Sequence, residues 1–210
     1  MLISSMWRRI RRTTSDMIRD RSGVAATEFA VIVPVMLVLF FGTVEFSSGI
    51  AVDRKVTLVA RTLSDLTSQS MASVADTDLQ NFFAASGSIL TPYSVTPTQP
   101  TISEIFIDNN KIAKIQWSKA ANLSMVNGAP QAVLKNSTHS TGDTVTVPAG
   151  LLVANTYLIW SEVDYIYVPT VGYVMKNSIT LHDETYTRPR QSTCVDHPAP
   201  VAPAVACTPA

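Results

Sequence analysis

Apolar residues are spread unevenly along the chain, and one run of them is long enough to cross a membrane. From Val24 to Val44 the only charged residue is Glu28. A helix over these 21 residues rises roughly 31 Å, about the thickness of the hydrocarbon core of a bilayer. A single span satisfies its own backbone there only as a helix. We therefore expect a transmembrane helix that Pro34 bends near Ala30.

Past this run the apolar residues take up the spacing of an amphipathic helix. They recur at intervals of four, three, four and three, and charged residues fall off the stripe, which consists of Val52, Val56, Val59, Leu63 and Leu66. This spacing predicts one continuous helix over residues 24–69, whose second half packs on a head domain. A second helix is expected over Asp78–Ala85, capped by Asp76 or Thr77 and ended by Gly87.

In the second half of the chain the period changes to two, which predicts β-strands. The runs 102–107 and 111–119 flank Asp108-Asn109-Asn110, an arrangement typical of a β-hairpin. Further strands are expected over Thr144–Val147, Thr156–Val168 and Ser178–Arg188, the second of them central in the sheet.

The remaining stretches of the second half are rich in breakers or polar residues. Thr91–Thr101 holds three prolines and predicts a linker without regular structure. Ala121–Ser140 predicts a long loop with one helical turn at Ala132–Lys135. Together these elements predict an α+β fold, in which the long N-terminal helix is followed by a small antiparallel β-sheet head. We expect the strands to form a meander, covered by the helices on one face.

These patterns divide the chain into four parts. The first is a basic leader over residues 1–23, followed by the transmembrane and amphipathic helix over 24–69. The third is an α+β head over 70–190, and the last is a flexible tail over 191–210 that is rich in proline and alanine.

The net charge is zero, but it is distributed asymmetrically. The leader holds six arginines and two aspartates, a net of +4, and the remainder carries −4. Basic residues at one end of a lone span predict that this end stays in the cytoplasm, so the head is expected in the periplasm of a bacterial inner-membrane protein. Because the basic block is short and the rest is acidic, no nucleic-acid partner is expected.

Glu28 is the anomaly of the apolar run. A carboxylate inside the apolar zone costs about 2.5–3.5 kcal/mol on insertion scales. One interpretation is that Glu28 sits near the headgroups and is simply solvated. The other follows from Gly23, five residues before it. Cleavage after Gly23 would create a cationic amine on Val24, one helical turn from Glu28 and able to pair with it in the same or a neighbouring chain.

This arrangement resembles the class III signal of type IV pilins and pseudopilins: a short basic leader, Gly23, four residues, Glu28, the aromatic Phe29, and an apolar helix. More narrowly, residues 24–35 and 42–46 resemble TadE-like and TadG-like minor pseudopilins of the tight-adherence (Tad/Flp) pilus. The resemblance covers about residues 19–66.

The resemblance implies a division of roles at this site. A prepilin peptidase would cut between Gly23 and Val24, and Glu28 with Phe29 would act in assembly. The implied partners are the inner membrane, the peptidase, other pilins and pseudopilins, and the Tad secretion machinery. The implied role is a structural component of a pilus that serves in cell adhesion.

No motif in the sequence predicts catalysis, a cofactor, a metal site or a small-molecule substrate. The three histidines, His139, His182 and His197, are scattered. The aromatic residues of Thr156–Val168 are interpreted as core packing rather than a binding face. Cys194 and Cys207 either close a small loop as a disulfide or remain two thiols on a flexible tail.

Two other functions fit parts of the sequence. An unprocessed chain would be a single-pass anchor for a periplasmic binding or adhesion domain. A chain cut after the apolar run by ordinary signal peptidase would be secreted, although the run is longer than a usual signal core and no clear small-residue cleavage pattern follows it. The mature N-terminus distinguishes the three, because it would be Val24, Met1 or a residue near Ile50.

Overall fold

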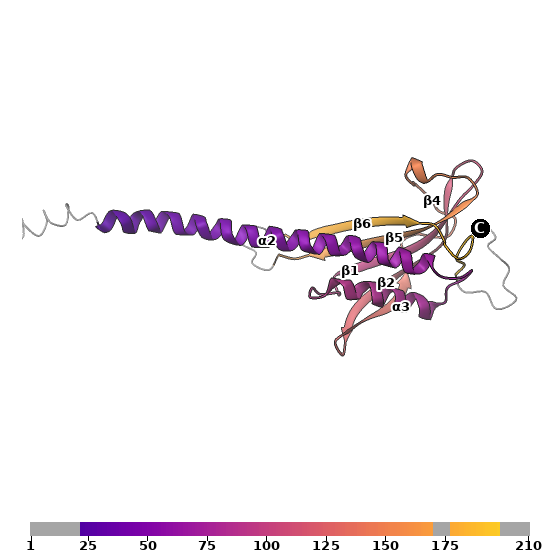
Figure 1. Ribbon diagram of the computed structural model, residues 1–210, viewed down its shortest axis with the longest axis horizontal. Helices are drawn as coiled ribbons and strands as arrows, with labels where there is room; N and C mark the ends of the chain where they lie inside the picture. Colours follow the sequence, from indigo (N-terminus) through magenta and orange to yellow (C-terminus); the bar gives the residue numbers. More distant parts are fainter. Residues whose placement is uncertain (1–21, 170–176, 198–210) are drawn as a thin grey trace, which may run out of the picture.

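A computed structural model of the chain describes residues 22–169 and 177–197. It contains one long helix whose first half projects away from the rest and whose second half lies along a sheet (Figure 1). This helix, α2, spans Ser22–Ser68 and confirms the continuous helix predicted over 24–69. The predicted α+β fold, a long helix followed by a small antiparallel sheet, is also confirmed. The leader up to residue 21 lies outside the described residues.

Helix α2 buries the predicted apolar stripe. Val52, Val56, Val59 and Leu63 are fully buried, and Leu66 is half-buried. The helix continues through Pro34 without a break, and its projecting half shows only gentle curvature (Figure 1). The bend predicted near Ala30 is therefore small, because a proline inside a long helix removes one hydrogen bond while the turns on both sides persist.

The second helix, α3, spans Asp76–Gly87 and continues into the 3-10 turn η1, Ser88–Leu90. The predicted cap is wrong, since Ala75 occupies the N-cap position. Its backbone N–H donates to the carboxylate of Asp78 at 3.3 Å. Asp76 and Thr77 instead form the first turn, and Gly87 ends the helix as predicted.

The sheet has six strands in the order β3-β2-β1-β5-β6, all antiparallel, with β4 paired to β2. Their bounds are β1 Thr98–Ile107, β2 Ala113–Val126, β3 Ala129–Asn136, β4 Thr144–Val145, β5 Thr156–Tyr167 and β6 Ile179–Thr187. The predicted meander is wrong, because β5 returns to pair with β1 and leaves β1 in the middle. Strand β1 buries residues on both faces, for example Ile102 and Ile105, and it pairs with β2 along one edge and with β5 along the other.

The predicted hairpin of β1 and β2 is confirmed. In its turn, Oδ1 of Asp108 accepts hydrogen bonds from the N–H groups of Asn110 and Ile112, each at 2.8 Å. The irregular linker predicted over Thr91–Thr101 is too long, because β1 already begins at Thr98. Pro100 is tolerated there since the register with β2 starts only at Thr101.

The long loop predicted over Ala121–Ser140 is wrong, and so is its helical turn. Strand β2 extends to Val126 and a second hairpin leads directly into β3. Its two turn residues, Asn127 and Gly128, have φ of 51° and 79°. An Asn-Gly pair with both φ angles positive is the favoured two-residue hairpin turn.

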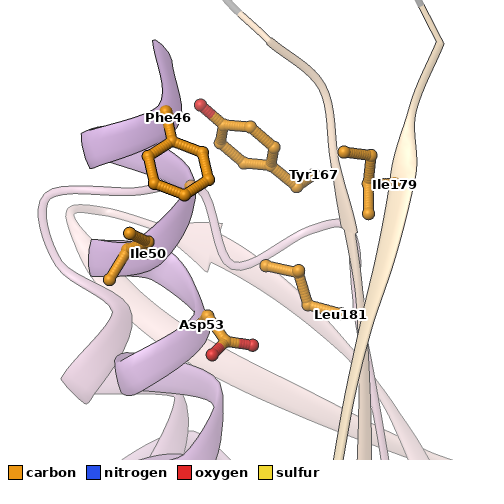
Figure 2. A pocket seen from close by; sticks show the side chains of 7 residues that line it. Phe46, Ile50, Asp53, Tyr167, Ile179 and Leu181 are labelled. Carbon is orange, nitrogen blue, oxygen red and sulfur yellow. The ribbon is translucent and has the colours of Figure 1, made fainter. Parts of the chain in front are cut away.

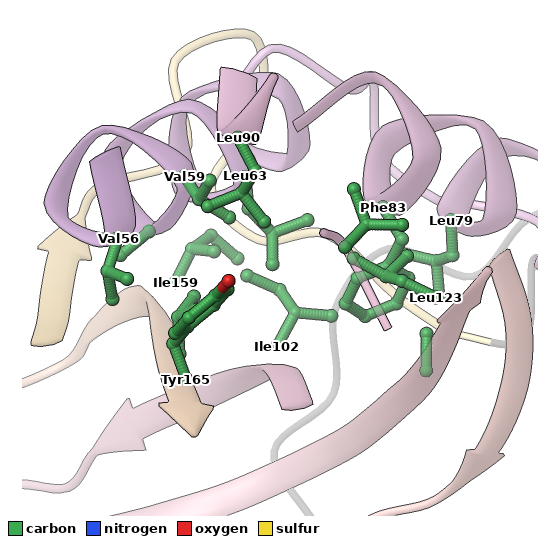
Figure 3. Close-up of a cluster of buried hydrophobic side chains, with 14 of the residues drawn as sticks. Val56, Val59, Leu63, Leu79, Phe83, Leu90, Ile102, Leu123, Ile159 and Tyr165 are labelled. Carbon is green, nitrogen blue, oxygen red and sulfur yellow. The ribbon is translucent and has the colours of Figure 1, made fainter. Parts of the chain in front are cut away.

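The two faces of the sheet are covered differently. Helix α2 packs on β5, β6 and β1, and α3 packs on β3 and β2, which gives the main core of Val59, Leu63, Phe83, Ile102 and Ile159 (Figure 3). A smaller core lies on the other face and contains Ile105, Ile107, Ile115, Val147, Leu158 and Trp160. The connection through η2, Ala149–Leu151, packs on this second core.

The predicted tail does not begin at residue 191. Cys194 and Val195 are fully buried, and the carbonyl oxygen of Val195 accepts a hydrogen bond from Nε1 of Trp117 at 2.6 Å. Asp196 pairs in parallel with Ser73. Residues 194–196 therefore belong to the head, while residues 198–210 lie outside the described part of the chain.

The β2–β3 turn predicts the effect of a small substitution. Gly128→Ala should lower the free energy of unfolding by about 1–2 kcal/mol, because an alanine at positive φ brings its Cβ against the backbone. Urea denaturation of the detergent-solubilised chain measures this. Gly150→Ala is the matched control, since that glycine has no positive φ and its new Cβ would meet nothing within 4 Å. Equal stability of the two variants would contradict the prediction.

Candidate functional site

The predicted cleavage and assembly residues lie together at the start of α2. Gly23 and Val24 fall in its first turn, and Glu28 and Phe29 lie one turn further. All four are exposed, with Val24 at 54% and Phe29 at 69%. Val24 and Glu28 are four residues apart on the helix, so both side chains lie on the same face.

The helix start determines what an amine on Val24 would encounter. An α-helix carries partial positive charge at its N-terminus, which a nearby carboxylate offsets. The carbonyl of Val24 already accepts a hydrogen bond from Oγ1 of Thr27 at 2.8 Å. Because this end of the helix is already positive, a cationic amine on Val24 would be unfavourable there by itself. The carboxylate of Glu28, one turn along the helix, is placed to neutralise it.

The helix that carries this site exposes its apolar side chains on all sides. None of the most apolar stretch of α2 is buried, and the exposed residues include Ile32, Met36, Leu39 and Phe40, each more than half exposed. A water-soluble protein rarely leaves so large an apolar surface uncovered. By length and composition this helix suits single-pass membrane anchoring.

The head begins where the apolar stretch ends. Glu45, the first charged residue past the apolar stretch, is only 2% exposed and packs against the head. The hydroxyl of Tyr167 at the end of β5 donates to the backbone oxygen of Glu45 at 3.5 Å. Burial raises the pKa of Tyr167, and the charge of Glu45 raises it further.

Polar contacts fix the second half of α2 to the head. Nζ of Lys55 donates to the carbonyl oxygens of Ile89 and Thr91, at 2.7 and 2.8 Å. Further along the helix, Thr57 donates to Asp183 of β6. Near its end, Asp65 forms an ion pair with Arg190. These contacts hold the second half of the helix against the head.

The histidines do not converge on a common site. Each pairs separately with a carboxylate at 2.7 Å, and the pairs are His139 with Glu162, His182 with Asp164, and His197 with Asp76. The hydrogen bond that His182 makes to the carboxylate of Asp164 raises the pKa of His182. In the part of the chain that the structure describes, no group of three or more histidine, cysteine or acidic residues could hold a metal ion.

Cys194 is buried in the segment that packs on Trp117, and it is not a free thiol. Cys207 lies outside the described residues, so pairing of Cys194 with Cys207 stays a prediction. The expected placement of Cys194 on a flexible tail is wrong.

Glu104 is the most strongly perturbed acid of the head. It lies on β1 beneath the C-terminal segment and is 1% exposed. Burial raises its pKa to about 8, against the opposing effect of a hydrogen bond from the N–H of Val195, which donates to Oε1 at 2.6 Å. This acid is therefore largely protonated at neutral pH and ties the C-terminal segment to the middle strand.

Comparison with known families adds one finding. The chain matches the family described as TadE-like protein over residues 23–64. The match begins at Gly23 and ends within the part of α2 that packs on the head, and it covers about a fifth of the chain. It confirms the resemblance to TadE-like proteins and suggests a component associated with a Tad pilus. No curated protein and no solved structure gives a significant match to the chain.

Two buried acids of the head and its junction with α2, Glu45 and Glu104, were not predicted from the sequence. The burial of Glu45 has no local signal, because it depends on Tyr167 far along the chain. Glu104 does have one, since it is the only acid between the apolar residues Ile102 and Phe106 on one face of a predicted strand.

Glu104 predicts a pH dependence of stability. Its folded-state pKa of about 8 lies above its ordinary value of 4.5, so across this window the folded chain keeps a proton that the unfolded chain has released. The stability contributed by Glu104 is full below about pH 4.5 and falls as pH rises toward 8, by up to about 1.4 kcal/mol per pH unit. Glu104→Gln should flatten this fall.

Urea denaturation at pH 5, 6, 7 and 8 measures the effect as the difference between the two stability curves. His182 and Glu162 titrate in both proteins and cancel in that difference. Parallel curves for Glu104→Gln and the unsubstituted chain would show that Glu104 is not the group responsible.

Proposed function

We propose that the chain is a minor pseudopilin, a membrane-inserted structural component of a Tad-type pilus or a related secretion machinery. The observation that carries the proposal is the position of Glu28. It lies one helical turn after the Gly23–Val24 bond, at the start of an exposed apolar helix that continues unbroken into a folded head. The TadE-like match over residues 23–64 supports the same role.

The proposal also includes the orientation of the chain across the membrane. The arginine-rich leader would remain in the cytoplasm, and the head would fold in the periplasm. A prepilin peptidase would then hydrolyse the bond between Gly23 and Val24 on the cytoplasmic side. Hydrolysis leaves the carboxylate on Gly23 of the departing leader and a protonated amine on Val24. No catalytic activity of the chain itself is required.

Cleavage changes the balance between membrane and filament. Glu28 alone disfavours the apolar phase by about 2.5–3.5 kcal/mol. In an assembled fibre, the amine of Val24 in its own or a neighbouring chain could pair with Glu28, away from water. The charge therefore weakens the membrane-inserted state and strengthens the assembled one.

The head contributes rigidity to this process. Because Lys55, Thr57 and Asp65 fix α2 to the head, a force applied to the head is transmitted to the apolar half of the helix. Extraction of the helix from a membrane and its insertion into a fibre can then occur as one movement of a rigid subunit.

The first test is the cleavage site. In cells that contain the cognate peptidase, intact-mass measurement of the membrane-purified chain should find Val24 as the N-terminus. Gly23→Asp should abolish this product, because a charged side chain replaces a residue with none at the cut bond, while Gly150→Asp should leave it unchanged. Retention of Met1 in the unsubstituted chain would instead support an anchored binding or adhesion domain.

The second test concerns Glu28. Glu28→Ala should still be cut after Gly23 but should be incorporated into sheared pili roughly a hundredfold less, since a difference of about 3 kcal/mol then favours the membrane. Arg61→Ala is the control, because Arg61 is an exposed charged residue of the same helix outside both the apolar stretch and the head's packed face. Equal incorporation of Glu28→Ala and the unsubstituted chain would disprove the proposed pairing.

A further inference from the structure

An apolar groove lies where α2 passes the end of β5 and the start of β6. Its volume is about 240 Å³, and it is lined by Phe46, Gly49, Ile50, Asp53, Tyr167, Ile179 and Leu181. Figure 2 shows Phe46 and Ile50 on the helix facing Tyr167, Ile179 and Leu181 across the gap. Gly49 leaves the helix side open, and a Cβ there would lie 3.7 Å from the ring of Tyr167.

The groove lies directly beyond the apolar stretch that suits a membrane. At 1.5 Å per residue, Phe46 is about 3 Å past Val44 along the helix axis, and Ile50 is about 9 Å past it. The interfacial layer on each side of a bilayer is about 5–8 Å thick. If residues 24–44 span the hydrocarbon, the part of the groove nearest Val44, around Phe46, lies within this layer.

The side chains around the groove are of the types expected in the interfacial layer. Phe46 is 66% exposed, and Ile50 and Ile179 are each 41% exposed. Tyr167 adds an aromatic ring with its hydroxyl turned toward Glu45, an arrangement favoured at membrane interfaces. The acid Asp53 lines the groove further from the apolar stretch, about 14 Å past Val44.

We propose that this groove holds the upper acyl-chain segment of a phospholipid from the leaflet on the head's side of the membrane. The argument is continuity, because the apolar surface of the helix passes into the groove without an intervening charge except the buried Glu45. Phe46, Ile50 and Ile179 are then covered by lipid while the subunit waits in the membrane. The proposal rests on the membrane insertion contained in the proposed function.

Lipid binding in the groove would restrict the orientation of the subunit in the membrane. The helix alone leaves its tilt and rotation in the bilayer free, whereas a groove on one side of it fixes which side of the head faces the membrane surface. Extraction of the subunit from the membrane would uncover the groove.

The test uses the full chain reconstituted at one copy per nanodisc, with a phospholipid that carries a photoreactive diazirine near the glycerol end of one acyl chain. After illumination, mass spectrometry maps the lipid adducts. We expect adducts on residues 46–50, 167 and 179 as well as within 24–44. Met71, which is 78% exposed at the far end of the head, should carry none.

A matched pair of variants separates the groove from general exposure. Ile179→Asn should reduce the adducts on residues 46–50 roughly tenfold, because it places a polar group in the proposed lipid contact. Ile112 is also 41% exposed but lies beside the β1–β2 turn, so Ile112→Asn should leave the adducts unchanged. Thermal unfolding of both variants shows whether the head remains folded.

The outcomes distinguish the two proposals. Adducts in 24–44 but not in the groove would overturn the lipid site and leave the membrane span intact. Absence of adducts from both regions would overturn membrane insertion itself. Groove adducts that appear only when several copies share one disc, as crosslinks between chains, would assign the groove to a neighbouring subunit and also overturn the lipid site.

Discussion

An ionised carboxylate is far less stable in hydrocarbon than in water or beside a cation, and the long helix is built around one such group. Glu28 is the only charge between Val24 and Val44, where every other feature favours the membrane. In the proposed function, a subunit without Glu28 would have no electrostatic reason to leave the bilayer. With Glu28 present, the helix would keep enough apolar surface to insert, while the carboxylate would stay unpaired until an amine came close.

The charge of Glu28 lies far from the head, and the second half of α2 connects the two. The same helix that exposes Phe29 and Phe40 buries Val52, Val56 and Leu63 under the sheet. No loop interrupts α2 between these regions. The exposed apolar half and the packed half of the helix therefore belong to one continuous element.

The sequence predicts the elements of this structure wherever the signal is local. The stripe Val52 to Leu63 has helical spacing, and the residues around Asp108 have the composition of a turn, so both were predicted correctly. The Asn127-Gly128 turn was also encoded locally, but the polar residues around it favoured a loop. The failures with no local cause are those in which one residue depends on a distant one. Val195 is buried because Trp117 and Glu104 bind its backbone, and Glu45 is buried because β5 ends beside it.

The same distinction explains why the sequence places the proposed cleavage and assembly residues on one helix but gives no sign of the groove. In the proposed function, Gly23, Val24 and Glu28 would act through their spacing along one helix, which can be read directly from the sequence. The groove exists only because β5 ends and β6 begins at the level where α2 leaves its apolar stretch, and that level is set by the register of Tyr167 with Ile179. Glu28 and the groove thus lie at opposite ends of the apolar stretch, about 27 Å apart along the helix. In the proposed function, a fibre that accepts this subunit would have to satisfy a charge at one end and cover an apolar hollow at the other, and the amine of a neighbouring chain is the proposed partner for the charge.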